Sequence, residues 1–289
     1  MRNIKQTSIW LSPFIFALCL LLAPKSGLTF QDSVENADIF AKGYIEVVGE
    51  SESGQRRYAA IRAATVVAQR NLMEAIKEIR VEGETTVADG MLQNDTVRSR
   101  VSGFLRGARI CGRKYHAGER YGEVCLRINL KGNGGVYDSL YSTLEQEKIV
   151  TTGGEAPLSP QPSMAANAFK VDGGVNDSYD GVIIELAGHS FKPAIVNRIL
   201  NQKGDILFDP SRVINSILID RGTGGFTNKL GKAKGLLASW NGVNPLMINA
   251  VGTQQGTDAV ISDQDAKTLF AADQNNSFLS QAKVVFVIN

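Results

Sequence analysis

The sequence predicts a two-domain α+β protein in which a long Ala-rich helix packs on a mostly antiparallel sheet and a second, β-rich α+β domain follows. Three features predict it: a strand–turn–helix stretch over residues 43–79, a hairpin that carries two cysteines, and a change of composition after residue 146. Helices and strands alternate without a long parallel run, which is typical of α+β folds. A length of 289 residues with 43% hydrophobic content suits two packed domains.

The first domain is organised around the stretch from Gly43 to Ile79. Tyr44–Val48 is rich in β-branched and aromatic residues between two glycines, which predicts a strand. Ser51 or Ser53 is expected to cap the helix that follows. Apolar side chains at steps of three and four predict its buried stripe: Tyr58, Ile61, Thr65, Ala68, Leu72, Ala75, Ile76 and Ile79. Four alanines would let a sheet approach closely, namely Ala59, Ala60, Ala63 and Ala64.

A basic cluster opens this helix, formed by Arg56, Arg57 and Arg62. Such a cluster is typical of a solvated helix end, and the alternative is contact with an anionic surface.

The first 27 residues have the pattern of an export signal. Arg2 and Lys5 precede the apolar run Ile9–Ala23, which is shorter than a full membrane span. Residues 1–27 are therefore expected to be a signal peptide, or an N-terminal anchor if uncleaved. Cys19 lies inside the run after Leu18, which argues against lipid attachment there.

The mature chain is expected to be close to neutral. The full chain has 31 basic and 29 acidic residues, and the leader removes three of the basic ones, which leaves a net charge near −1. A near-neutral exported protein has no electrostatic footprint for nucleic acid.

Two cysteines remain after the leader and flank a predicted hairpin. A turn centred on Gly118 places Cys111 opposite Cys125, on the face away from Ile110 and Val124. In an oxidising compartment, facing cysteines pair, so we predict a cross-strand disulfide. The alternative is two free thiols.

The rest of the first domain, 42–146, is predicted as a strand over Arg80–Val87, a helix over Asp95–Leu105 capped by Asp95, and a closing helix over Val136–Leu144. Residues 147–180 are rich in glycine and proline and are predicted to be a flexible linker.

Residues 181–289 form the second domain. Its predicted strands are Gly181–Ala187, Asn197–Leu200, Asp205–Phe208, Ser216–Asp220, Leu246–Val251, Asp258–Ile261 and a central, fully buried Val284–Ile288. Its predicted helices are Leu230–Trp240 and one capped by Ser262 and Asp265.

Few residues indicate chemistry. His116 and His189 have no partner at metal-ligand spacing, and the acidic residues near Asp258 lack the pattern of a calcium loop. We therefore expect no catalytic residue, cofactor or metal. A glycine-rich turn lacks the spacing of a phosphate loop, but it precedes lysines that would contact an anion or ligand. These possible contact residues are Gly222, Gly224, Gly225, Lys229 and Lys232, and the alternative is a turn before a charged helix face.

Residues 42–131 resemble a family of bacterial envelope proteins that includes the FlgT-like N-terminal domain of flagellar assembly protein T and related twenty-kilodalton-type lipoproteins. The shared pattern is a strand ending in glycine, a polar turn and a helix of the form A-x-x-A-A-x-x-x-A-x-x-x-L. It appears here as Val48-Gly49, Ala60, Ala63, Ala64, Ala68 and Leu72, followed by Val81–Gly83. Unlike the lipoprotein members, this chain has no usable lipid-attachment cysteine.

The resemblance implies a non-enzymatic, periplasmic structural or assembly protein without cofactors. Its expected partners are other envelope proteins, including flagellar basal-body or outer-membrane components, with membrane contact only through an uncleaved leader. The alternative function is a periplasmic small-ligand or cell-wall binding module in the second domain. A deep apolar pocket would favour that alternative, and an unpaired sheet edge would favour the structural protein.

Overall fold

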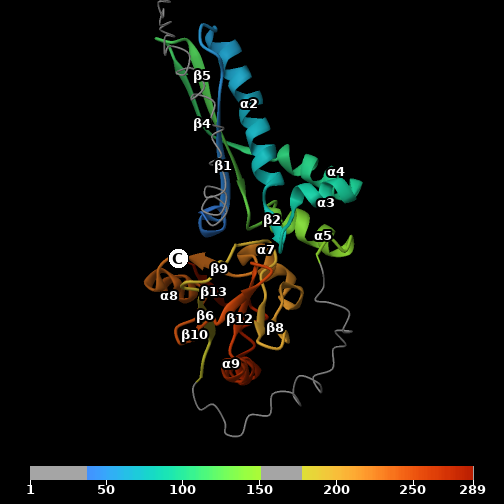
Figure 1. Ribbon diagram of the computed structural model, residues 1–289. Helices are drawn as coiled ribbons and strands as arrows, with labels where there is room; N and C mark the ends of the chain where they lie inside the picture. The colour runs from blue at the N-terminus through green and yellow to red at the C-terminus, as the bar shows by residue number, and fades with distance from the viewer. Residues whose placement is uncertain (1–37, 151–177, 289) are drawn as a thin grey trace, which may run out of the picture.

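The computed structural model describes residues 38–150 and 178–288 (Figure 1). The first half is an arm made of one long helix and a narrow sheet, and shorter helices lie where the arm meets the second half. Its elements are β1 (Tyr44–Glu50), α2 (Arg57–Lys77), β2 (Arg80–Glu82), β3 (Thr85–Thr86), α3 (Val87–Gln93), α4 (Asp95–Leu105), β4 (Arg109–His116), β5 (Tyr121–Asn129), η1 (Tyr137–Tyr141) and α5 (Ser142–Gln146).

The arm confirms the predicted helix on an antiparallel sheet. Strand β5 lies between β1 and β4 and runs antiparallel to both. The helix packs on one face of this sheet through side chains that recur about every fourth residue, which gives one continuous buried stripe. These are Ala60, Ala64, Ala68, Leu72 and Ile76.

Two glycines let the helix approach the sheet closely. A Cβ atom at Gly49 of β1 would lie 2.1 Å from the backbone nitrogen of Ala68, and one at Gly122 of β5 would lie 2.7 Å from the carbonyl carbon of Ala60. Alanine on the helix and glycine on the strand therefore bring two backbones together with no side chain between them. The stripe includes Ala60 and Ala64 for this reason, whereas Tyr58, which we expected in it, is 78% exposed.

Gly49→Ala is expected to lower the free energy of unfolding by about 1–3 kcal/mol, because the added methyl group meets backbone atoms that can move only with the whole helix. Urea denaturation followed by circular dichroism would measure the loss. Gly103→Ala in α4 is the control, because a Cβ atom there meets nothing within 4 Å. Equal stability of the two variants would contradict the proposed close packing.

Two predicted helix caps of the first half differ from those observed. The N-cap of α2 is Arg56 without a side-chain cap, and the Ser51 hydroxyl instead accepts a hydrogen bond from the Gly122 amide. Helix α4 is capped by Asn94 rather than Asp95. Arg80–Val87 is not one strand but the short hairpin β2–β3, which turns at Gly83 with φ +53°.

The cysteine hairpin is confirmed, with a shifted register. A bulge between Ile110 and Gly112 places Gly112, rather than Cys111, opposite Cys125. The disulfide still forms across a Cα–Cα distance of 5.1 Å. Ile110 was expected on the buried face, but it lies on the edge strand and is 44% exposed.

The second half contains two four-stranded sheets and flanking helices. Its elements are β6 (Gly181–Glu185), β7 (Ile199–Asn201), β8 (Ile206–Phe208), η2 (Pro210–Arg212), α7 (Asn215–Arg221), β9 (Gly225–Thr227), α8 (Leu230–Ser239), β10 (Pro245–Asn249), β11 (Gly252–Gln254), β12 (Asp258–Ile261), α9 (Asp263–Asn276) and β13 (Val284–Val287). The helices Leu230–Trp240 and Ser262-capped α9 are confirmed, and so is the hairpin of β7 and β8.

The main sheet of the second half is parallel, in the order β10-β6-β13-β9. Strand β13 is central and buried at every position, as its continuous apolar sequence predicted. One face of the sheet packs on α8 through Ile183 and Val285. The other face belongs to the core that both halves share, where Phe40 of the first half packs on Phe226 at 5.5 Å.

One strand of this half was wrongly predicted. The predicted strand Ser216–Asp220 lies instead within the helix α7. Leu218 is the only buried residue of this helix, so one side chain per two turns faces the core rather than the alternating face of a strand. Gly222, with φ +69°, ends this helix.

The two halves are joined by backbone pairing as well as by their core. The amides of Ile195 and Val196 donate to the carbonyls of Arg80 and Val81, each at 2.9 Å. The amide of Gly83 donates to the Thr257 hydroxyl. The hairpin β2–β3 therefore anchors the arm to the second half.

Two predictions concern segments outside the described residues. The leader over 1–27 lies wholly outside them, and so do residues 151–177 of the predicted linker 147–180. The packed part of the first half continues to Val150, which is 4% exposed. Across residues 38–150 and 178–288, we find no helix with the length and apolar character needed to cross a membrane.

Candidate functional site

A buried cluster of charges lies at the junction of the halves. The side chain of Arg198 is 5% exposed, and its guanidinium contacts three buried carboxylates. Its Nε donates to Asp209 at 2.6 Å, one terminal nitrogen donates to Glu82 of β2 at 3.0 Å, and the other lies 3.8 Å from Asp258. One arginine thus joins the anchor hairpin to two segments of the second half.

Burial and the arginine act in opposite directions on these carboxyl groups. Burial raises the pKa of Asp258, and the charge of Arg198 offsets only part of this effect. Burial also disfavours the charged form of Asp209, but Arg198 and hydrogen bonds from Ser211 hold its pKa below the usual value. The guanidinium thus contacts carboxylates of both halves, and its loss alone would leave buried charge without a partner.

The glycine turn singled out in the sequence lies inside the protein. A Cβ atom at Gly222 would meet the Tyr137 ring at 2.6 Å, and one at Gly225 would meet Leu236 at 2.2 Å. A Cβ atom at Gly224 would meet the carbonyl oxygen of Val284 at 2.7 Å. The three glycines therefore permit close packing and leave no cradle for a ligand. Lys229, which precedes α8, and Lys232 on α8 are both exposed, so anion contact stays a prediction for these two lysines alone.

A lysine of the first half covers this turn. Lys131 donates to the Gly224 carbonyl at 3.0 Å, and its ammonium lies 6.0 Å from the centre of the Trp240 ring. Burial lowers its pKa to about 8, against a smaller opposing effect of Asp220. The folded protein therefore releases the Lys131 proton more readily than the unfolded chain does, and the lysine links the halves at a cost in stability when it is charged.

This cost predicts a pH dependence. Between pH 8 and 10.5 the unfolded chain binds the Lys131 proton and the folded chain has lost it, so stability from this group rises with pH. We expect a gain on the order of 1 kcal/mol from pH 7 to 9.5, since partial solvent contact screens the effect. Lys131→Met should abolish the gain in thermal unfolding experiments, and the exposed Lys229→Met should keep it. Parallel pH profiles for wild type and Lys131→Met would contradict the assignment.

The two histidines each have a partner within the protein. His116 stacks on Tyr121 with a centroid distance of 4.2 Å, and its Nε2 lies 3.1 Å from a Glu123 oxygen. The Nε2 of His189 lies 3.1 Å from the Ala250 carbonyl oxygen. These contacts are enough to hold both rings in place.

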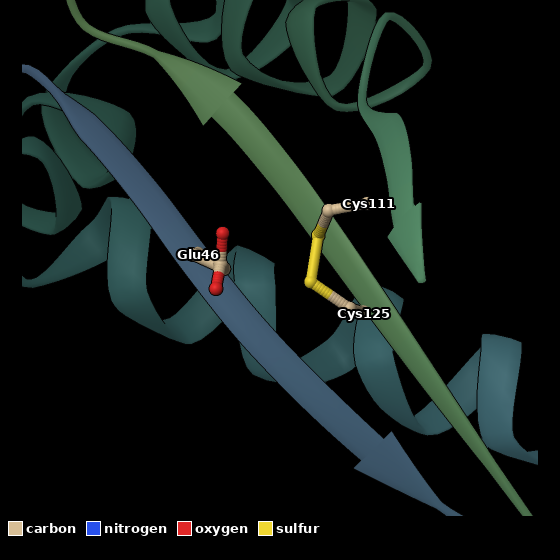
Figure 2. A group of neighbouring side chains, drawn as sticks. All are labelled: Glu46, Cys111 and Cys125. Carbon is tan, nitrogen blue, oxygen red and sulfur yellow. A yellow bond between two sulfur atoms is a disulfide. The ribbon is translucent and has the colours of Figure 1, made fainter. Parts of the chain in front are cut away.

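The disulfide lies on the outer face of the arm's sheet, opposite the face that α2 covers. Figure 2 shows the Glu46 carboxylate of β1 beside it, and the ligand atoms of Glu46, Cys111 and Cys125 lie within 4.8 Å of one another. While the cysteines are bonded they supply no thiolate for a metal. Arg127 also binds Glu46 and lies over the Tyr44 ring at 4.2 Å.

A shallow cleft of about 510 Å³ lies where the anchor hairpin meets the second half. Lys192 reaches across it to Glu84, with an Nζ–oxygen distance of 3.4 Å. The pKa of Glu84 is lowered, first by its hydrogen bond from Arg80 and then by Lys192 to a smaller extent. The cleft is lined by Gly83, Glu84, Ser190, Lys192, Thr253, Gln255 and Gly256.

A second groove, of about 410 Å³, runs along the arm between the start of α2 and the edge strand β4. The lining comes from both elements: Arg57, Tyr58, Ile61, Arg113, Lys114 and Tyr115. Tyr115 is fixed by a hydrogen bond from its hydroxyl to the Gln55 carbonyl. The sequence showed the cations at the start of the helix but not those of β4, because only the fold brings the two elements together.

The comparisons with known proteins address the second half. Residues 181–289 match a family model described as the second domain of Treponema pallidum Tp0624. The match begins at β6 and includes the whole parallel sheet. No curated protein matches the chain significantly.

Proposed function

We propose that this chain is a non-enzymatic structural or assembly protein of the bacterial cell envelope that acts through its surfaces. In this proposal it is exported to the periplasm, or remains anchored in the inner membrane if its leader is not cleaved. Its partners are other envelope proteins, and flagellar basal-body or outer-membrane components are the class that the FlgT-like resemblance of residues 42–131 suggests.

The observation that carries the proposal is the arm. Strands β1 and β4 form the two edges of its sheet, and each pairs with β5 alone among the described residues. Helix α2 covers one face, while side chains such as Val48, which is 45% exposed, stand on the other. An unpaired edge is a template for another chain, so a rigid arm with two such edges suits docking.

The disulfide supports the proposed compartment. Cys111 and Cys125 are bonded on an exposed hairpin, and such bonds persist in oxidising environments such as the periplasm. The N-terminal charge and apolar pattern agrees with export.

The proposal can be tested in the native organism with a tagged full-length chain. A photocrosslinking amino acid at Val48, on the edge strand β1, is expected to capture envelope proteins that mass spectrometry can identify. The same residue at the exposed Gln264 of α9 is the matched control. A purely cytosolic chain, or equal capture from both positions, would contradict the proposal.

The alternative function is binding of a small ligand or cell-wall fragment by the second half. The cleft beside Lys192 is the feature that favours it, since side chains and backbone fill the space around the glycine turn. Titration with peptidoglycan-derived oligosaccharides discriminates the two functions: saturable binding that Lys192→Met abolishes would support the alternative.

A further inference from the structure

The groove along the arm has an uneven charge. It is lined by three cations, Arg57, Arg113 and Lys114, and by no carboxylate. All three are exposed, and among the described residues none of them forms an ion pair. In a mature chain expected to be nearly neutral, three unneutralised cations beside one groove mark a site for negative charge.

The N-terminus of helix α2 adds positive charge beside the same groove. Helix α2 begins at the groove without a side-chain cap and without an acidic residue in its first turn. The positive end of a 21-residue helix therefore lies beside the same groove. Glu123 lies across from Lys114 on the outer face and contacts His116.

The groove is bordered by backbone as well as by charge. Strand β4 is eight residues long and pairs with β5 on one side only, so within the described chain its other edge has no partner strand. Arg113 stands on the α2 side of the sheet, opposite Val124, and Lys114 stands on the outer side, opposite Glu123. A strand added to β4 would therefore meet a cation on each of its faces.

We propose that the open edge of β4 and the groove beside it bind an extended, acidic segment of a partner protein as an added strand. This inference rests on the proposed docking function and names the chemistry of the partner. Backbone hydrogen bonds to β4 supply affinity, as in other cases of strand addition. Carboxylates on the added strand pair with Arg57, Arg113 and Lys114, while the rings of Tyr58 and Tyr115 and the Ile61 side chain pack against its apolar residues.

The features of the groove favour a peptide over a membrane surface. An anionic headgroup would use the cations alone, but the cations lie beside an unpaired strand edge and two tyrosine rings. Tyr58 is 78% exposed and offers apolar area that a side chain of an added strand would cover.

The test uses the full mature chain and a dye-labelled decamer, Glu-Glu-Val-Val-Glu-Glu-Val-Val-Glu-Glu, which presents carboxylates and apolar side chains on both faces of an added strand. Binding is measured by fluorescence anisotropy at low salt. Saturable binding is expected. The double variant Arg57→Glu/Arg113→Glu should weaken it at least tenfold, whereas the charge-matched Arg70→Glu/Arg100→Glu should bind like wild type. All four arginines are exposed, and circular dichroism confirms that each variant is folded.

Two further probes separate strand addition from charge attraction. The same decamer N-methylated at its four central residues keeps its charge but loses amide donors on both edges, so it should bind at least tenfold more weakly. Equal binding of the two decamers would overturn the proposal, and so would no binding of the parent decamer. Binding of phosphatidylglycerol vesicles through Arg57 and Arg113 without decamer binding would identify a membrane surface instead. Any of these failures leaves crosslinking at Val48 as a separate test of the docking function.

Discussion

Arg198→Met is expected to lower the free energy of unfolding by about 3–5 kcal/mol, the largest effect of any single substitution proposed for this chain. The guanidinium is buried with Glu82, Asp209 and Asp258, and its loss leaves three carboxylates without a counter-charge. Methionine fills similar volume, so the loss reports charge more than a cavity. Urea denaturation at pH 7, followed by circular dichroism, measures it.

The same variant should respond to pH in the opposite direction from an ordinary acid-sensitive protein. Without Arg198, burial raises the pKa of Asp209 and Asp258 above their unfolded values, so the folded state binds more protons. Its stability then rises as pH falls from 7 to 5, and the gap to wild type narrows. In wild type, by contrast, the lowered pKa of Asp209 gives stability that is lost only in stronger acid.

Arg212→Met is the matched control, because Arg212 is exposed on the neighbouring η2. It should change stability by less than about 0.5 kcal/mol. A loss below about 1 kcal/mol for Arg198→Met, with no dependence on pH, would show that the arginine does not neutralise the cluster.

Local patterns predicted the parts of the fold that depend on local interactions. Helix α2, strand β1 and the cysteine hairpin follow from periodicity, propensity and turn residues, which act over a few positions. Strand β13 was also predicted, because a fully apolar run bounded by polar residues is typical of a central strand.

Features that depend on distant segments were missed. Gly49 was interpreted as the end of a strand, yet its lack of a side chain is what allows the backbone of Ala68 to pack against the strand. The parallel order β10-β6-β13-β9 joins strands far apart in the chain, so no window of sequence contains it. Ser216–Asp220 was wrongly assigned as a strand because its β-branched content was visible and its lack of a pairing partner was not.

The candidate sites likewise combine residues that the local sequence singled out with neighbours that only the fold brings close. Arg57 was identified as part of a basic cluster, but its position beside Arg113 and the open edge of β4 arises from the packing of α2 on the sheet. Arg198 gave one local signal, a single charge within the apolar stretch 194–200. Its three partners come from separate segments of the chain, so the cluster could be recognised only in the folded protein.

Replacement of both cysteines, Cys111→Ser/Cys125→Ser, is expected to lower the free energy of unfolding by about 3 kcal/mol. The bond closes a loop of 14 residues, and removing it restores that much freedom to the unfolded chain. The effect should concentrate on the arm, because β4 is an edge strand that β5 holds from one side only. Hydrogen exchange should quicken in β4 while β12 and β13 keep their protection.

Reductant provides the control for this prediction. Wild type treated with a dithiol should lose the same stability as the serine variant, and the variant itself should not respond to the dithiol. Alkylation of both thiols in untreated wild type would refute the bond, and unchanged exchange in β4 would refute its role in holding the edge strand.

If β4 loosens as expected, decamer binding should weaken with it, because an added strand needs an ordered edge on which to form hydrogen bonds. The disulfide would then determine whether the edge of β4 can bind an added strand.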